Sequence, residues 1–261
     1  GSSVLKKMFS GAEDAALRHA NAVITICPAL ADFATSRIED TEKHFLIENS
    51  IYEPVKLKKN PGVEAAEVSA ADVIDGISSE GAGSIGLSAG TLDTYQGLDL
   101  LLESMPDVKA KEASIRLIVV GGSAAQVSHY EDMAARLGVD DVCTFTGRVP
   151  QAVAKDFTAR ADILTSPRTR GMNTPLKIYE LLDCGKPLVA TRIPSHTQVL
   201  TEDVAFLADP EPYDFAVAVA DAAGDAGSVA EKVATARRLY ATDYSPAAYG
   251  EKIDRWLERI R

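Results

Sequence analysis

Residues 166–191, SPRTRGMNTPLKIYELLDCGKPLVAT, contain a loop, a helix and a strand in succession, and they indicate how the rest of the chain is built. The apolar run 161–166 in front of the loop has the length of a buried parallel strand. Thr174 is predicted to be the N-cap of a helix, and Pro175 its first residue. Gly185, followed by Pro187, predicts the end of this helix. Leu188–Thr191 predicts the next strand, so the stretch is one repeat of an alternating β/α pattern.

The predicted helix has an apolar face and a charged face. Ile178, Leu181 and Leu182 follow the i, i+3, i+4 spacing and should pack on the sheet. Lys177 and Glu180 lie three residues apart on another face, near the helix start. From the residues alone, this pair fits equally well a weak surface ion pair on a capped helix or part of a binding site.

Basic residues gather where this helix begins. Arg168, Arg170 and Lys177 should converge with free backbone N–H groups just beyond the carboxyl end of a strand. Open α/β sheets bind ligands at that edge, and the start of a helix suits phosphate. The stretch therefore predicts a site for an anionic ligand.

The chain from Ser84 onward alternates short apolar runs with amphipathic segments and has no long insertion. This alternation predicts an α/β fold with a doubly wound parallel sheet and right-handed crossovers. The expected strands are 22–26, 44–48, 85–89, 115–120, 142–145, 161–166, 188–191 and 204–207, and the expected helices are 4–20, 28–37, 63–74, 98–104, 127–137, 151–160, 195–200, 213–223, 228–240 and 246–260.

Composition excludes several classes of protein. A net charge of −11 argues against nucleic-acid binding, and no apolar run has the ~18 residues of a transmembrane helix. The three cysteines are far apart, lack the spacing of a metal site and indicate free thiols in a reducing, cytoplasmic compartment. The cluster Lys56, Lys58 and Lys59 fits a solvated linker better than a membrane anchor, so any membrane contact is expected to be peripheral to the inner face.

The stretch 166–191 resembles the donor-site segment of the family-4 (group 1) retaining glycosyltransferases of GT-B fold. Ser166-Pro167 match a dipeptide of that family, and the residues from Gly185 to Ala190 match its G-x-P-V-V-A strand. Glu180 matches the second of two glutamates eight residues apart, which bonds the ribose, whereas Met172 replaces the first. The whole stretch follows the PR..G.NTPLKIYE form of one family branch.

The resemblance implies a division of the chain into four parts. Residues 1–52 resemble the C-terminal fragment of the acceptor domain, and residues 53–82 are expected to be a linker. Residues 83–245 would form the nucleotide-sugar donor-binding domain, which is the Rossmann-like half of a GT-B fold. Residues 246–261 would be the C-terminal helix that crosses back to the first domain, where Trp256 is expected to pack.

The first strand–helix turn departs from the family. Most relatives have G-R-L-x-x-x-K-G there, and the arginine and lysine grip the diphosphate of the donor. This chain keeps Gly90 but has Thr91 and Gln96 in place of the two charges. Charged hydrogen bonds contribute roughly 1.5–3 kcal/mol each. The basic residues of the 166–191 stretch would have to compensate, or donor binding would be weak.

Two later turns and one histidine are further candidates. Gly122, in a Gly-Gly turn, would let a ligand approach the backbone. Arg148 and Val149 match the family's F-x-G-x-V turn, where backbone groups meet the nucleobase and Arg148 would stack on it. His196 opens a short helix near the same edge; it fits a phosphate or sugar contact, although a histidine at such a place is more often structural.

The family's reaction moves a sugar from a nucleotide diphosphate sugar, here UDP- or GDP-linked, to an acceptor with retention of configuration and without a cofactor or metal. Lys177 and Glu180 are expected to be catalytic. The main body of the acceptor domain is expected to lie elsewhere, in a longer polypeptide or a partner chain, so this chain should bind donor but turn over poorly. The expected donor-binding residues are Gly90, Thr91, Gly122, Arg148, Val149, Arg168, Arg170, Met172, Asn173, Thr174, Lys177 and Glu180.

Two other functions remain open at this point. A degenerate, non-catalytic nucleotide-sugar-binding or scaffold domain is favoured by the lost charges at Thr91 and Gln96. A nucleotide-sugar epimerase of the same fold would need acid and base residues in the cleft, for which only His196 and Glu180 are candidates.

Overall fold

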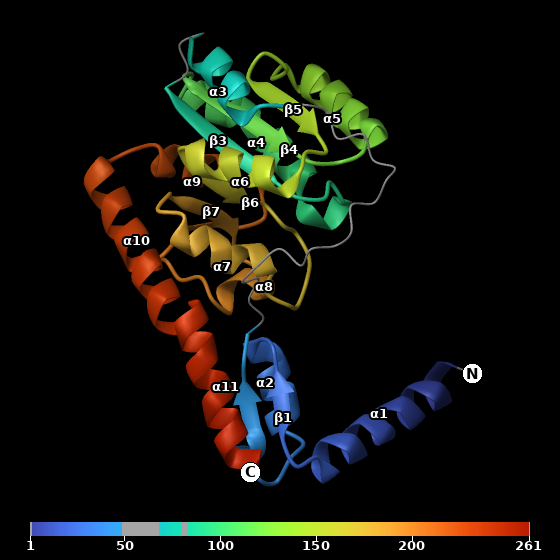
Figure 1. Cartoon of the computed structure of the whole chain (residues 1–261). Helices are drawn as coiled ribbons and strands as arrows, with labels where there is room; N and C mark the ends of the chain where they lie inside the picture. Colours follow the sequence, from blue (N-terminus) through green and yellow to red (C-terminus); the bar gives the residue numbers. More distant parts are fainter. Residues whose placement is uncertain (1, 49–67, 80–82, 261) are drawn as a thin grey trace.

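A computed structural model describes residues 2–48, 68–79 and 83–260 (Figure 1). The lysine cluster predicted in the linker lies outside these residues, as does the first part of the helix predicted at 63–74. Within the predicted linker, α3 spans Ala70–Ser79, and its Ala70 and Ile74 are buried against the sheet.

The main body is a six-stranded sheet in which every pair of neighbours is parallel, as the alternating sequence pattern predicts. Its spatial order is β5-β4-β3-β6-β7-β8, so the chain moves outward from β3 in one direction and returns to β6 to move in the other. The strand bounds are β3 Ser84–Ala89, β4 Ile115–Val120, β5 Cys143–Gly147, β6 Ile163–Ser166, β7 Leu188–Thr191 and β8 Phe206–Ala208. The point of reversal lies between β3 and β6, where doubly wound sheets bind ligands.

Helices cover both faces of this sheet because its strands are apolar on both sides. In β4, Leu117 and Val119 face one core, while Ile118 and Val120 face the other. The first core contains α4 Leu98–Lys111, α5 Ala124–Leu137 and α9 Pro212–Ala222. The second core contains α3, α6 Gln151–Arg160, α7 Leu176–Asp183 and α10 Ala226–Leu239.

The N-terminal residues form a smaller unit with its own two-stranded parallel sheet. It consists of α1 Ser2–His19, β1 Val23–Thr25, α2 Pro28–Thr35, a 3-10 turn at Thr41–Lys43 and β2 His44–Leu46. Figure 1 shows α1 extending away from the rest of the molecule.

The last helix, α11 Pro246–Ile260, runs beside this small unit (Figure 1). Lys252 Nζ lies 2.6 Å from Glu48 Oε2, and Arg259 lies 3.0 Å from Glu42. Trp256, which was expected to pack on the first domain, has a buried indole nitrogen. The crossover helix therefore ties the two units together through its polar side chains.

Several predicted helix and strand bounds were wrong. Helix α4 continues through Pro106 to Lys111 because Met105 and Val108 are fully buried there, which offsets a cost of about 3 kcal/mol for an interior proline. Pro175, and not Thr174, is the N-cap of α7, and it makes no side-chain cap bond. The helix predicted at 195–200 is the shorter α8, Pro194–Thr197, and β8 begins two residues later than the predicted strand.

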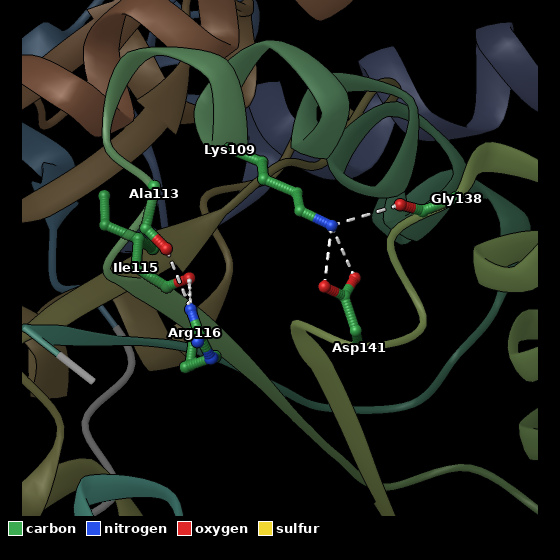
Figure 2. Close-up of polar contacts among 6 residues, drawn as sticks. All are labelled: Lys109, Ala113, Ile115, Arg116, Gly138 and Asp141. Atoms are coloured by element: carbon green, nitrogen blue, oxygen red, sulfur yellow. Dashed lines mark hydrogen bonds and ion pairs between the residues drawn. The ribbon is translucent and has the colours of Figure 1, made fainter. Parts of the chain in front are cut away.

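The amino edge of the sheet is held by side-chain contacts (Figure 2). Lys109 Nζ, near the end of α4, is 2.7 Å from both carboxylate oxygens of Asp141, just before β5. Arg116 in β4 donates to the carbonyls of Ala113 and Ile115 at 2.9 and 3.2 Å. The lysine lowers the pKa of the Asp141 carboxyl through its hydrogen bond. The charged side chains Lys109, Arg116 and Asp141 at this edge therefore all have hydrogen-bond partners within the protein.

Candidate functional site

The opposite edge of the sheet, at the point of reversal, brings together the end of β3, the loop after β6 and the start of α7. The N–H of Gly90 donates to the carbonyl of Val120 at 3.0 Å, which fixes the chain as it leaves β3. Lys177 Nζ, from the first turn of α7, reaches across to 3.5 Å from the carbonyl oxygen of Ala89. One side chain thus links the two halves of the sheet at the place where ligands bind in this architecture.

The loop after β6 is ordered by Arg168. Its Nε donates to the carbonyl of Arg170 at 2.6 Å, and its guanidinium carbon is 5.2 Å from the centre of the Tyr95 ring. Its carbonyl accepts a hydrogen bond from the Thr191 hydroxyl at the end of β7. A Cβ added at Gly171, where φ is +143°, would lie 2.3 Å from that guanidinium, so only glycine lets the loop fold over the arginine.

Lys177 is partly buried and lacks an anionic partner. Burial of its ammonium, with a smaller contribution from the charge of Arg168, lowers its pKa to about 8. No ion pair involves Arg168, Arg170 or Lys177 among the residues that the structure describes. An unpaired, partly desolvated cation at a ligand-binding edge is a candidate partner for an anion.

The pairing of Lys177 with Glu180 as a surface ion pair is excluded. No bond joins the two side chains in the described structure, because Lys177 turns toward β3 instead. The helix also lacks the expected cap, since the N-cap position falls on Pro175, one residue beyond Thr174. Of the two interpretations that the sequence left open, the capped helix with a surface pair is wrong.

The turn after β3 has no basic side chain at Thr91 or Gln96. Thr91 is exposed, and Gln96 ends a 3-10 turn, with its side-chain oxygen buried and without a hydrogen-bond partner among the described residues. Gly97, with φ of +75°, lies so close to the loop after β6 that an added Cβ would be 1.9 Å from the carbonyl oxygen of Pro167. Glycine at this position therefore serves the contact between the two halves.

The Gly-Gly turn after β4 has a packing reason. A Cβ at Gly121 would be 2.0 Å from the carbonyl oxygen of Gly90, and one at Gly122 would be 2.5 Å from the Leu92 side chain. Close packing against the first turn accounts for both glycines. The absence of a side chain at Gly122 therefore lets Leu92 of the first turn pack against the backbone there.

The remaining predicted donor-binding residues do not form one cluster but lie at several places on this edge of the sheet. Arg148 is exposed beyond the end of β5, two strands from β3, and Val149 packs against the core. Arg170 lines a cavity of about 440 Å³ on the α4 side, with Tyr95 and Glu211. Met172 and Asn173 are exposed at the end of the loop.

His196 is a structural residue, so a direct contact with donor is wrong for it. It is fully buried, and its Nδ1 lies 2.9 Å from the carbonyl oxygen of Thr191 while its Nε2 lies 3.1 Å from Ser166 Oγ. These partners assign the proton to Nδ1. Burial lowers the pKa of His196 to about 4, so the ring is neutral at pH 7. The epimerase hypothesis thereby loses one of its two acid–base candidates.

Sequence reasoning missed Gln198, which follows α8. Its Oε1 accepts from the N–H of Ala29 in α2 at 2.8 Å, and its Nε2 donates to the carbonyl of Met172 at 2.6 Å. It also missed Tyr95, the ring beneath Arg168. No local pattern marks either residue, because each gains its partners through the fold.

A model of the family described as "Glycosyl transferases group 1" matches residues 84–225. D-inositol 3-phosphate glycosyltransferase of Kribbella flavida is 28% identical over 203 residues, which cover 72% of this chain and 48% of the relative. One subunit of the phosphatidylinositol N-acetylglucosaminyltransferase from Arabidopsis thaliana is 30% identical over 125 residues, which cover 48% of this chain and 27% of the relative. The chain thus matches less than half the length of these curated relatives.

A solved structure has a similar fold. The crystal structure of Anabaena Alr3699/HepE in complex with UDP superposes with a TM-score of 0.74 at 18% identity, over 93% of this chain and 65% of that one. Within the part of the chain described here, no helix has the length and apolar character needed to cross a membrane.

Proposed function

The chain belongs to the group 1 glycosyltransferases, and we propose that it is the donor-binding half of a retaining hexosyltransferase that uses a UDP- or GDP-linked sugar. Its sheet is the Rossmann-like half of a GT-B fold. One observation carries the proposal: the ammonium of Lys177 lies at the reversal point, 3.5 Å from the carbonyl oxygen of Ala89 at the end of β3, and has no carboxylate partner among the described residues. A diphosphate is the anion that this edge of the sheet suits best.

The residues at this edge would assist the reaction by electrostatic stabilisation of the leaving group. As the bond from sugar to diphosphate breaks, negative charge grows on the leaving phosphate. Lys177, Arg168 and the start of α7 stabilise that charge, and a partly desolvated site strengthens their effect. Glu180, partly buried and without a side-chain bond among the described residues, is free to accept hydrogen bonds from the ribose. The backbone of Met172–Thr174 meets the sugar.

The acceptor site belongs to further protein that completes the small N-terminal unit. A two-stranded parallel sheet is rarely stable alone, and parallel sheets are normally covered on both faces. On α1, the side chains of Leu5, Met8 and Phe9 are 55%, 66% and 73% exposed at helical spacing. We propose that an earlier segment of a longer polypeptide, or a partner chain, covers this stripe. Donor binding then needs only this chain, whereas efficient turnover needs both.

We propose a cytoplasmic location, with membrane contact no more than peripheral at the inner face. The names of the relatives give their own acceptors, and we propose no acceptor for this chain from them. The proposal for this chain is therefore limited to the donor.

Calorimetric titration of the chain with UDP, GDP, ADP and their common sugar conjugates tests the proposal. We expect saturable binding of one nucleotide, weakened at least about tenfold by Glu180→Ala through loss of a hydrogen bond to ribose. Glu131→Ala, at an exposed position of α5, is the matched control and should bind as the wild type does. A folded chain that binds none of these ligands would overturn the proposal and favour the scaffold function, which the uncharged Thr91 and Gln96 support.

A further inference from the structure

Gln198 joins three parts of the chain with one side chain. Its Oε1 accepts from the Ala29 N–H at 2.8 Å, and its Nε2 donates to the carbonyls of Met172 and Pro194 at 2.6 and 3.0 Å. Ala29 belongs to the N-terminal unit, and Met172 belongs to the loop at the candidate donor site. The oxygen of the side-chain amide therefore contacts the N-terminal unit, and its nitrogen contacts the loop at the candidate donor site.

The contact with Ala29 is a helix cap supplied from the other unit. The first N–H groups of a helix have no partner within it, and the side chain of Cys27, the N-cap of α2, caps none of them. Gln198 supplies the missing acceptor from 169 positions away in sequence. A second, weaker contact crosses the same boundary, where Cys27 Sγ lies 3.9 Å from Asn173 Oδ1.

Only an amide of this length fits the three partners. Ala29 presents a donor, while Met172 and Pro194 present acceptors, so the orientation of the amide is fixed. A glutamate would set a carboxylate oxygen against two carbonyls, and a methionine of similar length would make none of these bonds. The arrangement is therefore specific to glutamine.

We propose that Gln198 is a positioning residue that couples the donor loop to the N-terminal unit. A sugar seated against Met172–Thr174 steadies the loop, and Gln198 transmits that order to the first turn of α2. Conversely, an acceptor unit that draws α2 away removes the support of the loop. This inference rests on the proposed function for its ligand, but the link between Ala29 and Met172 exists without one.

Hydrogen exchange at the Ala29 amide tests the link, because that amide is bonded to Gln198 itself. The wild type, Gln198→Met and the control Gln151→Met, an exposed glutamine at the start of α6, are compared alone and with saturating UDP-glucose or GDP-mannose. In the free chain, we expect Gln198→Met to speed exchange at Ala29 about tenfold, as loss of one partly buried hydrogen bond predicts. With the sugar nucleotide, Ala29 should slow about threefold or more in the wild type and control but not in Gln198→Met.

A second readout separates coupling from a purely structural role. Gln198→Met should bind UDP or GDP within about twofold of the wild type but lose about tenfold in affinity for the sugar conjugate. Equal donor-induced slowing at Ala29 in Gln198→Met, or unchanged exchange in the free chain, would overturn the coupling. If the wild type binds no nucleotide, the proposed function fails, and exchange at Ala29 in the free chain alone then decides whether the link exists.

Discussion

The two edges of the large sheet treat their charged residues in opposite ways. At the amino edge, Lys109 is 2.7 Å from both oxygens of Asp141, and the pair is largely exposed (Figure 2). At the carboxyl edge, Lys177 has a backbone carbonyl 3.5 Å away and no carboxylate partner in the described structure. In the first arrangement each charge is paired with the other, so no ligand is needed to neutralise either of them. The second leaves a cation for which burial is unfavourable, and such an arrangement is typical of a ligand site.

The carboxyl edge is also held by uncharged bonds where the amino edge uses an ion pair. His196 joins Ser166, the last residue of β6, to Thr191, the last residue of β7. Thr191 in turn holds the carbonyl of Arg168. A neutral support beneath a cationic rim avoids adding a second charge to the site. The two edges should therefore respond differently to mutation, pH and salt.

The largest effect on stability is expected at His196. Replacement by alanine removes its three close hydrogen-bond contacts and leaves the buried hydroxyl of Ser166 unpaired, so unfolding should require about 3 kcal/mol less. In the wild type, the folded pKa of about 4 lies below the ordinary 6.5, so the unfolded chain binds the proton first. This residue's stabilisation is complete above pH 6.5 and is lost as pH falls toward 4. Urea unfolding from pH 7 to 4 measures both effects, and an unchanged pH slope in the alanine variant would contradict this account.

Lys177→Met separates binding from stability. Loss of the ammonium should weaken the nucleoside diphosphate about 30-fold, or about 2 kcal/mol, as for a charged hydrogen bond. The same change should raise the stability of the free chain by about 1 kcal/mol, because a cation whose pKa is depressed to about 8 opposes folding. Titration and chemical unfolding measure the two effects. Lys155→Met, at an exposed position of α6, should change neither, and a weaker fold in Lys177→Met would contradict the account.

Donor binding should fall as pH rises through about 8. The pKa of Lys177 is lowered to about 8 in the free chain, so the ammonium is present below that value and lost above it. Because loss of the ammonium weakens binding about 30-fold, the dissociation constant should rise about fourfold between pH 8.5 and 9.5 in the wild type and stay flat in Lys177→Met. A flat profile in the wild type would show that another group holds the phosphate.

The smallest effect is expected at the amino edge. Lys109→Met removes an exposed ion pair and should cost less than about 1 kcal/mol, with a further decrease in its contribution at high salt. Nucleotide binding should not change, because the pair lies at the opposite end of the strands. Thermal unfolding in low and high salt, together with one titration, checks both points.

The sequence predicted what depends on neighbouring residues and failed where distant residues meet. The run 161–191 defined β6, its loop, α7 and β7 through apolar runs and glycine or proline signals. The end of α4 could not be predicted, since burial of Val108 outweighs the local signal of Pro106. The direction of Lys177 depends on β3, which lies far away in sequence.

His196 and Gln198 show the same limit at the site. The role of His196 follows from two strand ends that no local pattern places beside it. The partners of Gln198 belong to different units of the chain. A residue's type and spacing indicate its chemistry, whereas its partners decide whether that chemistry faces a ligand or the interior.

The central claim is that Lys177 has no anionic partner among the described residues, so that a diphosphate can pair with it. The most direct test is proton uptake on binding at pH 8, measured by calorimetry in buffers of different ionisation enthalpy with whichever nucleoside diphosphate binds. With a free pKa of about 8, the wild type should take up about half a proton, because the bound anion restores the ammonium, and Lys177→Met should take up none. Equal uptake by both chains, or none by the wild type, would contradict the claim.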